Sequence, residues 1–171
     1  MANLLQFPGR IAAVFFGLTL VAGSALSVEL GQPASDFELL NLKQEGVKLS
    51  QYKGKVVYLD FWASWCVPCR ETFPFMNQLK EKYGKDGLEV IAINIDTKRP
   101  DADKFLAQVP AEFTVLFDPK RVVAKIYALK GMPTTFLIDR AGNLVSTHLG
   151  FQKERAGELE AVIAKAMTST P

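Results

Sequence analysis

The chain has 171 residues, of which 49% are hydrophobic and 22% are charged, and its formal net charge at pH 7 is +2. This length allows a single domain that buries a substantial core without disulfide staples. The small net charge, with no long basic run, gives no electrostatic basis for nucleic-acid binding.

The N-terminal residues have the three parts of a secretory signal. Arg10 precedes an uncharged stretch over residues 11–28, and small residues gather near its end. We therefore predict a signal peptide over residues 1–27, with cleavage after Ala25 or Ser27. The stretch is also nearly long enough to cross a hydrocarbon core of about 30 Å, so an uncleaved membrane anchor stays open. Both alternatives place the rest of the chain in an oxidising compartment.

After this segment, apolar runs of strand length alternate with segments of helical periodicity, which indicates an α/β domain with a mixed sheet covered on both faces. In chain order we expect an extended lead-in (30–35), a hairpin (37–42 and 47–49), a buried strand (from 56), a helix (66–83), a strand (88–95), a helix (101–109), a strand (114–117), a helix (119–129), a hairpin (134–138 and 144–149) and a helix (153–167). The two long apolar runs should pair in parallel across the helix between them.

The strand that begins at Val56 leads into a cysteine motif. Cys66 stands where the apolar run ends, and Pro68 stands early in the helix that follows, where its missing N–H costs nothing. The unpaired N–H groups and the dipole at a helix N-terminus favour an anion, so they should stabilise the Cys66 thiolate. Cys69 lies one turn further in, close enough to form a disulfide and more sheltered. Pro74 should bend or locally break this helix.

The two cysteines indicate a redox pair rather than a structural staple. A disulfide that closes so short a loop would restrict the unfolded chain by only about 2 kcal/mol, against about 5 kcal/mol for a 100-residue loop. We therefore predict a redox-active disulfide between Cys66 and Cys69, with no metal and no other cofactor. In the expected cycle, the Cys66 thiolate attacks a substrate disulfide and Cys69 resolves the mixed disulfide.

Asp60 is the one carboxyl in the buried run. Desolvation raises the pKa of a carboxyl group and permits proton exchange near neutral pH, which favours a catalytic role. The alternative is that Asp60 only accepts hydrogen bonds near the strand end.

Two segments carry a family resemblance: Asp-Phe-Trp-Ala-Ser-Trp-Cys-Val-Pro-Cys-Arg at 60–70 and Gly-Met-Pro-Thr-Thr-Phe-Leu-Ile-Asp at 131–139. With residues 31–37 and 52–57, they resemble the thioredoxin-like superfamily, and more closely its exported, TlpA-like branch of thiol-disulfide oxidoreductases. A lone C-x-x-C is a weak signal, but this combination is specific. The resemblance implies a thioredoxin-like fold over residues 30–171, with a central mixed β-sheet flanked by helices, an N-terminal β-hairpin and an inserted strand and helix.

The resemblance also implies roles for residues outside the cysteine pair. The aspartate that matches Asp60 relays a proton to the second cysteine, here Cys69. A cis peptide bond precedes Pro133 and brings the backbone of Met132 beside the disulfide. There it can pair with an extended substrate peptide by strand addition.

Further substrate contacts are expected next to the cysteines. Trp65, Val67 and Pro68 are expected to contact the substrate, and the Val67-Pro68 dipeptide also tunes the reduction potential. Trp62 could join Trp65 in an apolar rim or lie in the core.

The chain departs from the TlpA-like pattern just after the motif. Many members have a glutamate three residues after the second cysteine, where this chain has Thr72. Glu71 stands one place earlier, and on a helix one residue turns the side chain by about 100°. We therefore expect Glu71 to be an exposed acid of the first turn rather than a substitute for that glutamate.

The predicted function is thiol-disulfide oxidoreduction. The TlpA-like resemblance implies a periplasmic monomer, soluble or tethered to the inner membrane, that reduces disulfides of selected exported proteins in cytochrome c maturation or oxidase assembly. Its expected partners are those disulfide-containing exported proteins and a membrane thiol electron donor. The alternative is a copper-binding metallochaperone for cytochrome oxidase assembly, because two thiolates and the single histidine, His148, could hold Cu(I).

Overall fold

The computed structural model describes residues 29–169, so the predicted signal peptide or anchor lies outside the described residues. Within residues 29–169, none of the helices has the length and apolar character that crossing a bilayer requires.

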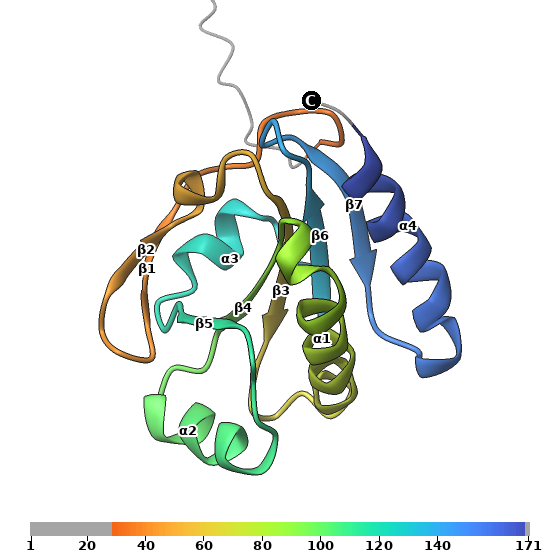
Figure 1. Ribbon diagram of the computed structural model, residues 1–171. Helices are drawn as coiled ribbons and strands as arrows, with labels where there is room; N and C mark the ends of the chain where they lie inside the picture. Colours follow the sequence, from red (N-terminus) through yellow and green to blue (C-terminus); the bar gives the residue numbers. More distant parts are fainter. Residues whose placement is uncertain (1–28, 170–171) are drawn as a thin grey trace, which may run out of the picture.

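A mixed β-sheet runs through the middle of the molecule (Figure 1), with strand order β2-β1-β5-β4-β3-β6-β7. The strands are β1 (Glu38–Asn41), β2 (Gly46–Lys48), β3 (Val56–Trp62), β4 (Leu88–Asn94), β5 (Thr114–Phe117), β6 (Thr134–Ile138) and β7 (Leu144–Leu149). Strands β3, β4 and β5 are parallel, and β1–β2 and β6–β7 form antiparallel hairpins. The predicted mixed sheet, its N-terminal hairpin and the parallel pairing of the two long runs are confirmed.

Helices cover both faces of this sheet, as predicted. They are α1 (Cys69–Tyr83), α2 (Arg99–Gln108), α3 (Val122–Ile126) and α4 (Ala156–Thr168), with short 3-10 helices at Leu49–Tyr52, Gly84–Asp86 and Lys153–Arg155. Trp62 of β3 packs against Phe73 of α1 and Phe105 of α2, with ring centroids 5.0 and 4.7 Å apart. The next side chain back along β3, Phe61, points to the other face and contacts Tyr127 at the end of α3.

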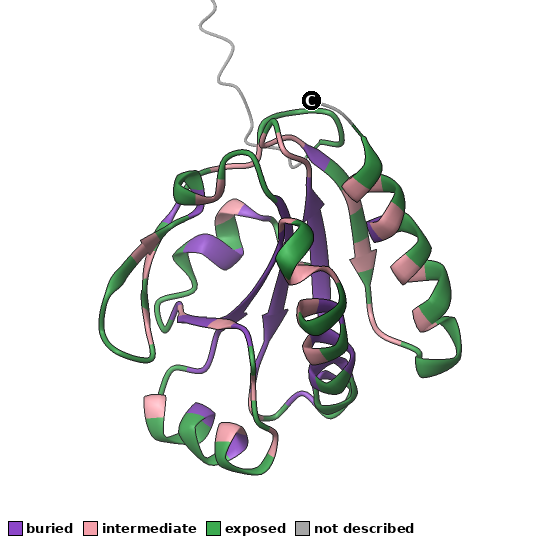
Figure 2. Ribbon diagram, in the orientation of Figure 1, coloured by how far each residue is buried: buried purple, intermediate pink, exposed green. Residues whose placement is uncertain are grey.

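The centre of the sheet is the most deeply buried part of the described chain (Figure 2). Every residue of β3 and of β4 is buried. Such continuous burial follows from their place, because a parallel strand inside a sheet with helices on both faces has no solvent-exposed side. The cysteine turn therefore follows directly on one of the most constrained strands.

Helix α1 differs from the prediction at two points. It begins at Cys69 rather than Cys66, because a tight turn precedes it in which the N–H of Cys69 donates to the Cys66 carbonyl (3.2 Å) and the N–H of Arg70 to the Val67 carbonyl (3.1 Å). Of the two effects predicted at Pro74, a bend or a local break, the break is wrong, since α1 runs through this residue. The carbonyl that Pro74 leaves without a helical donor belongs to Arg70, which is exposed to solvent.

Two other segments are more tightly turned than expected. Helix α3 covers only part of the predicted range 119–129, because the Asp118 carboxylate caps it by accepting from the N–H groups of Val122 (2.8 Å) and Ala124 (2.9 Å). It ends where Ala128 takes a positive φ of 48°. The lead-in over 30–35 is not extended throughout, since it turns at Gly31, where φ is 82°.

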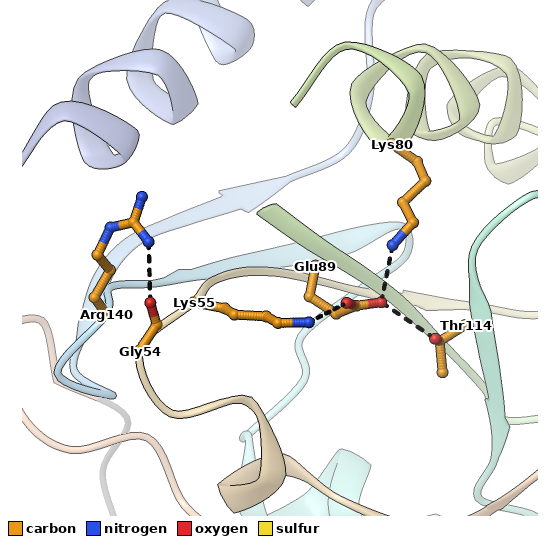
Figure 3. Close-up of polar contacts among 6 residues, drawn as sticks. All are labelled: Gly54, Lys55, Lys80, Glu89, Thr114 and Arg140. Carbon is orange, nitrogen blue, oxygen red and sulfur yellow. Dashed lines mark hydrogen bonds and ion pairs between the residues drawn. The ribbon is translucent and has the colours of Figure 1, made fainter. Parts of the chain in front are cut away.

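The end of the sheet away from the cysteines carries a buried carboxylate (Figure 3). Glu89, near the start of β4, accepts from Lys80 of α1 at 3.2 Å and from Lys55 before β3 at 3.3 Å. The hydroxyl of Thr114 on β5 donates to it at 3.4 Å. The side chain of Glu89 is only 9% exposed, while Lys55 and Lys80 are 49% and 32% exposed. This network joins α1 to three neighbouring segments of the sheet.

We predict an asymmetric response when this network is broken. Replacing Lys55 and Lys80 together by Met should lower the free energy of unfolding by about 3 kcal/mol, because it leaves a nearly buried carboxylate without a counter-charge. Glu89→Gln should lower the free energy of unfolding by only about 1 kcal/mol, because the two lysines are partly exposed and the amide oxygen still accepts a hydrogen bond. Urea unfolding of the oxidised protein measures both, and equal losses would contradict the explanation.

Candidate active site

Strand register brings two distant segments together at one end of the sheet. Strand β6 runs antiparallel to β3, with Phe61 opposite Thr134. The residue before Thr134 therefore lies where β3 ends and the cysteine turn begins. That residue is Pro133, and the peptide bond between Met132 and Pro133 is cis, as expected.

The two cysteines form a disulfide, with Cys66 Sγ and Cys69 Sγ 2.05 Å apart. Cys66 is 5% exposed and Cys69 is fully buried, so the second sulfur is the more sheltered one, as predicted. The residues beside Cys66 are open to solvent, since Trp65 is 62% and Val67 is 78% exposed. An incoming protein can therefore reach the pair only from the side of Cys66.

The two tryptophans of the motif have separate places. Trp62 is fully buried among Phe73 and Phe105, so its proposed membership of an apolar rim is wrong. Trp65 is exposed at the edge of the disulfide and remains available for an incoming chain.

A groove of about 540 Å³ lies beside the disulfide. It is lined by Trp65, Cys66, Val67, Pro68, Ile95, Leu129, Lys130, Gly131 and Met132. Four of the residues predicted to contact substrate are in this lining, whereas the fifth, Pro133, is buried and does not line it. The groove is mostly apolar, and among residues 29–169 Lys130 is the single charged side chain in its lining.

A polar cluster that sequence reasoning missed holds the segment before Cys66. The Asp96 carboxylate accepts from the N–H of Ser64 at 2.9 Å and from its hydroxyl at 3.1 Å. The side-chain amide of Asn94 donates to the same carboxylate at 2.8 Å. These bonds tie the chain two residues before Cys66 to the end of β4. The signal that could have found this cluster was the pair of polar residues that ends the apolar run of β4.

Asp60 lies on the face of β3 that α1 covers. Its neighbours on that face, Tyr58 and Trp62, both pack against aromatic rings of α1, at centroid distances of 6.3 and 5.0 Å. Asp60 is fully buried, and its Oδ1 accepts from the hydroxyl of Thr135 at 2.8 Å. Its Oδ2 has no hydrogen-bond partner within residues 29–169. The carboxyl thus lies under the helix that begins at Cys69.

Burial raises the pKa of Asp60 to about 8, although the hydrogen bond from Thr135 acts in the opposite direction. At neutral pH the group is therefore mostly protonated, and it becomes a carboxylate as the pH rises through 8. Thr135 was not predicted as a site residue. It faces Asp60 directly across the β3–β6 pairing, and that long-range register is not visible in the sequence.

The first turn of α1 bears out the expectation for Glu71. Glu71 is exposed, while Thr72 is buried and its hydroxyl donates to the Cys69 carbonyl at 2.9 Å. Thr72 therefore supports the backbone of the second cysteine.

His148 lies on β7, opposite Thr135 of β6. Within the part of the chain that the structure describes, no three His, Cys, Asp or Glu side chains are grouped so that they could hold a metal ion. Nothing in the described residues therefore favours the copper-binding alternative.

Comparisons with known proteins agree on one kind of chemistry. Residues 29–163 match the family model described as Redoxin. Thiol-disulfide oxidoreductase ResA of Bacillus thuringiensis is 34% identical over 152 residues, which covers 87% of each chain. ResA of Geobacillus kaustophilus is 38% identical over 118 residues, covering 69% of this chain and 68% of that protein.

Solved structures agree with the sequence relatives. A crystal structure from Chlorobium tepidum, described as a thiol:disulfide interchange protein DsbE, is 53% identical with a TM-score of 0.80, and the match covers 82% of this chain and 99% of that one. A solution structure from Bacteroides thetaiotaomicron, described as a protein disulfide isomerase, is 29% identical with a TM-score of 0.76 and covers 83% and 92%. The expected thioredoxin-like fold is confirmed.

The raised pKa of Asp60 predicts a pH-dependent stability difference. The folded state keeps this carboxyl protonated up to about pH 8, whereas the unfolded chain releases the proton near the ordinary value of 3.8. The oxidised wild type should therefore lose stability as the pH rises from 4 to 8, by up to about 1.4 kcal/mol for each pH unit in that window. Asp60→Asn should unfold at higher urea than wild type at pH 8, with the difference shrinking toward pH 4. A difference that does not change with pH would contradict the assignment.

Proposed function

The chain belongs to the Redoxin family, and from that premise we propose that it reduces disulfides of selected exported proteins. It is a thiol-disulfide oxidoreductase, as its relatives are named. The observation that carries the proposal is the Cys66–Cys69 pair at the edge of an apolar groove whose wall includes Met132, the residue of the cis bond. A substrate segment in this groove would present its own disulfide to Cys66.

The first step is attack by the less buried sulfur. In the reduced protein, the Cys66 thiolate attacks one sulfur of the substrate disulfide and forms a mixed disulfide. The substrate S–S bond breaks, and the departing substrate thiolate takes a proton from solvent. Helix α1 begins shortly after Cys66 in the sequence, and the unpaired N–H groups at its start would favour the thiolate form of Cys66.

The second step closes the internal disulfide. The Asp60 carboxylate takes the proton of the Cys69 thiol, and the Cys69 thiolate attacks the sulfur of Cys66. This attack forms the Cys66–Cys69 bond and releases the second substrate thiolate, so the substrate gains two electrons that the enzyme loses. The burial of Asp60 on the face of β3 that α1 covers, with one oxygen unpartnered within residues 29–169, supports the relay.

A second dithiol must return the two electrons. From the TlpA-like resemblance we infer a membrane thiol protein as this donor, and the groove open to solvent beside Cys66 can accept either partner in turn. The uncharged stretch after Arg10 supports an exported protein, periplasmic and either soluble or anchored. From the TlpA-like resemblance we infer substrates in cytochrome c maturation or oxidase assembly, such as apocytochrome c or a copper-site protein.

A trapping experiment tests the order of attack. When mixed with a peptide that contains a disulfide, Cys69→Ser should accumulate a stable mixed disulfide with one cysteine of that peptide, because the resolving sulfur is absent. Cys66→Ser should accumulate at least tenfold less, because the sulfur that remains is fully buried. Mass spectrometry of the quenched reaction measures both adducts. Equal trapping by the two variants would refute the assignment of Cys66 as the attacking sulfur.

The same assay reports on Asp60. With both cysteines present, the rate of resolution in wild type should rise with pH through about 8, following ionisation of this carboxyl. Asp60→Asn should resolve more slowly and without that rise. An unchanged pH profile would show that the proton of Cys69 leaves by another route.

A further inference from the structure

A second apolar groove adjoins the one at the disulfide, and Lys130 lines both. The second groove has a volume of about 430 Å³ and lies over the end of α3, β6 and the edge strand β7. Its apolar lining includes Tyr127, Phe136, Leu149 and Leu30. Leu149 and Leu30 are 59% and 62% exposed, so within residues 29–169 this groove offers apolar surface to solvent.

The two grooves meet at the backbone before the cis bond. A Cβ atom at Gly131 would lie 3.0 Å from a methyl carbon of Leu149, so the two residues are in close contact. Gly131 lines the first groove and Leu149 the second. An extended chain that leaves the disulfide along the first groove can therefore continue over Lys130 into the second.

The charge along this path has one sign. Lys130 is exposed and is the single charged side chain in the lining of either groove within residues 29–169, where it has no ion-pair partner. Asp96 and Glu29 stand next to the lining residues Ile95 and Leu30 in the sequence, but neither acid lines a groove, and Asp96 accepts hydrogen bonds from Ser64. Arg121 does not line either groove, but its side chain donates to the carbonyl of Ile95 at 3.2 Å, so a second cation lies next to the first groove.

We propose that the two grooves bind one extended segment of the substrate protein, with an acidic residue beside Lys130 and an apolar residue against Leu149 and Phe136. This inference rests on the proposed reductase function and adds a sequence preference, namely which substrate cysteines the enzyme accepts. The first groove alone would position any cysteine beside Cys66. The second groove and Lys130 would select cysteines flanked by acidic and apolar residues.

The test uses three cysteine peptides of equal length, each joined by a disulfide to the same chromophoric aromatic thiol. The first peptide carries Glu and Leu on both sides of its cysteine, so that binding direction does not matter. In the second peptide Lys replaces Glu, and in the third Ser replaces Leu. The second-order rate constant of reduction by the reduced protein is measured for each. Each constant is divided by that of the same protein variant with a small uncharged disulfide.

For wild type we expect the Glu-Leu peptide to react at least fivefold faster than the Lys-Leu peptide at low salt, with the ratio falling as salt screens the exposed charge. Lys130→Glu should reverse the ratio, and Lys130→Gln should bring it near one. Lys43→Glu makes the same change in net charge in the β1–β2 turn and should keep the wild-type ratio. Leu149→Ser should remove the advantage of the Glu-Leu peptide over the Glu-Ser peptide.

Two outcomes overturn the inference while leaving the proposed function intact. One is equal constants for all three peptides in wild type, together with normal reduction of the small disulfide. The other is a peptide preference that Lys130→Glu and Leu149→Ser both leave unchanged. If wild type reduces neither the peptides nor the small disulfide, the proposed function itself is wrong.

Discussion

The register between β3 and β6 is the constraint on which the whole site depends. With Phe61 opposite Thr134, the chain enters β6 through Pro133 at the point where β3 gives way to the cysteine turn. The same register places Asp60 opposite Thr135, and their side chains share a hydrogen bond. A slip by one residue would turn every side chain of β6 to the other face and separate these pairs.

The burial that fixes this register also sets the chemistry of the site. Strands β3, β4 and β6 are buried along their whole length. The same burial removes Asp60 from water and raises its pKa to about 8. A carboxyl in that range can exchange a proton near physiological pH, which an exposed aspartate cannot do. The stability lost by burying Asp60 is therefore coupled to the reactivity proposed for Cys69.

Local sequence patterns predicted most of the helices and strands, whereas they could not predict contacts between residues far apart in the sequence. The apolar runs located the strands because continuous burial leaves a direct trace in residue type. Helix α1 was predicted to start at Cys66 but starts at Cys69, because the residues around Val67 form a hydrogen-bonded turn instead of the first turn of the helix. The partner of Asp60 could not be predicted, since Thr135 is brought to it by pairing between strands 75 residues apart. Lys130 was missed for the same reason, because only the folded chain places it between two grooves.

The proposed direction of electron flow is from the Cys66–Cys69 couple to disulfides of other proteins. The decisive measurement is the reduction potential of this couple, obtained by equilibrating the purified protein with a glutathione buffer or a reference dithiol. We expect a value well below about −200 mV, at which the reduced pair can reduce substrates in an oxidising compartment. A value near about −120 mV, typical of a protein that donates disulfides, would contradict it.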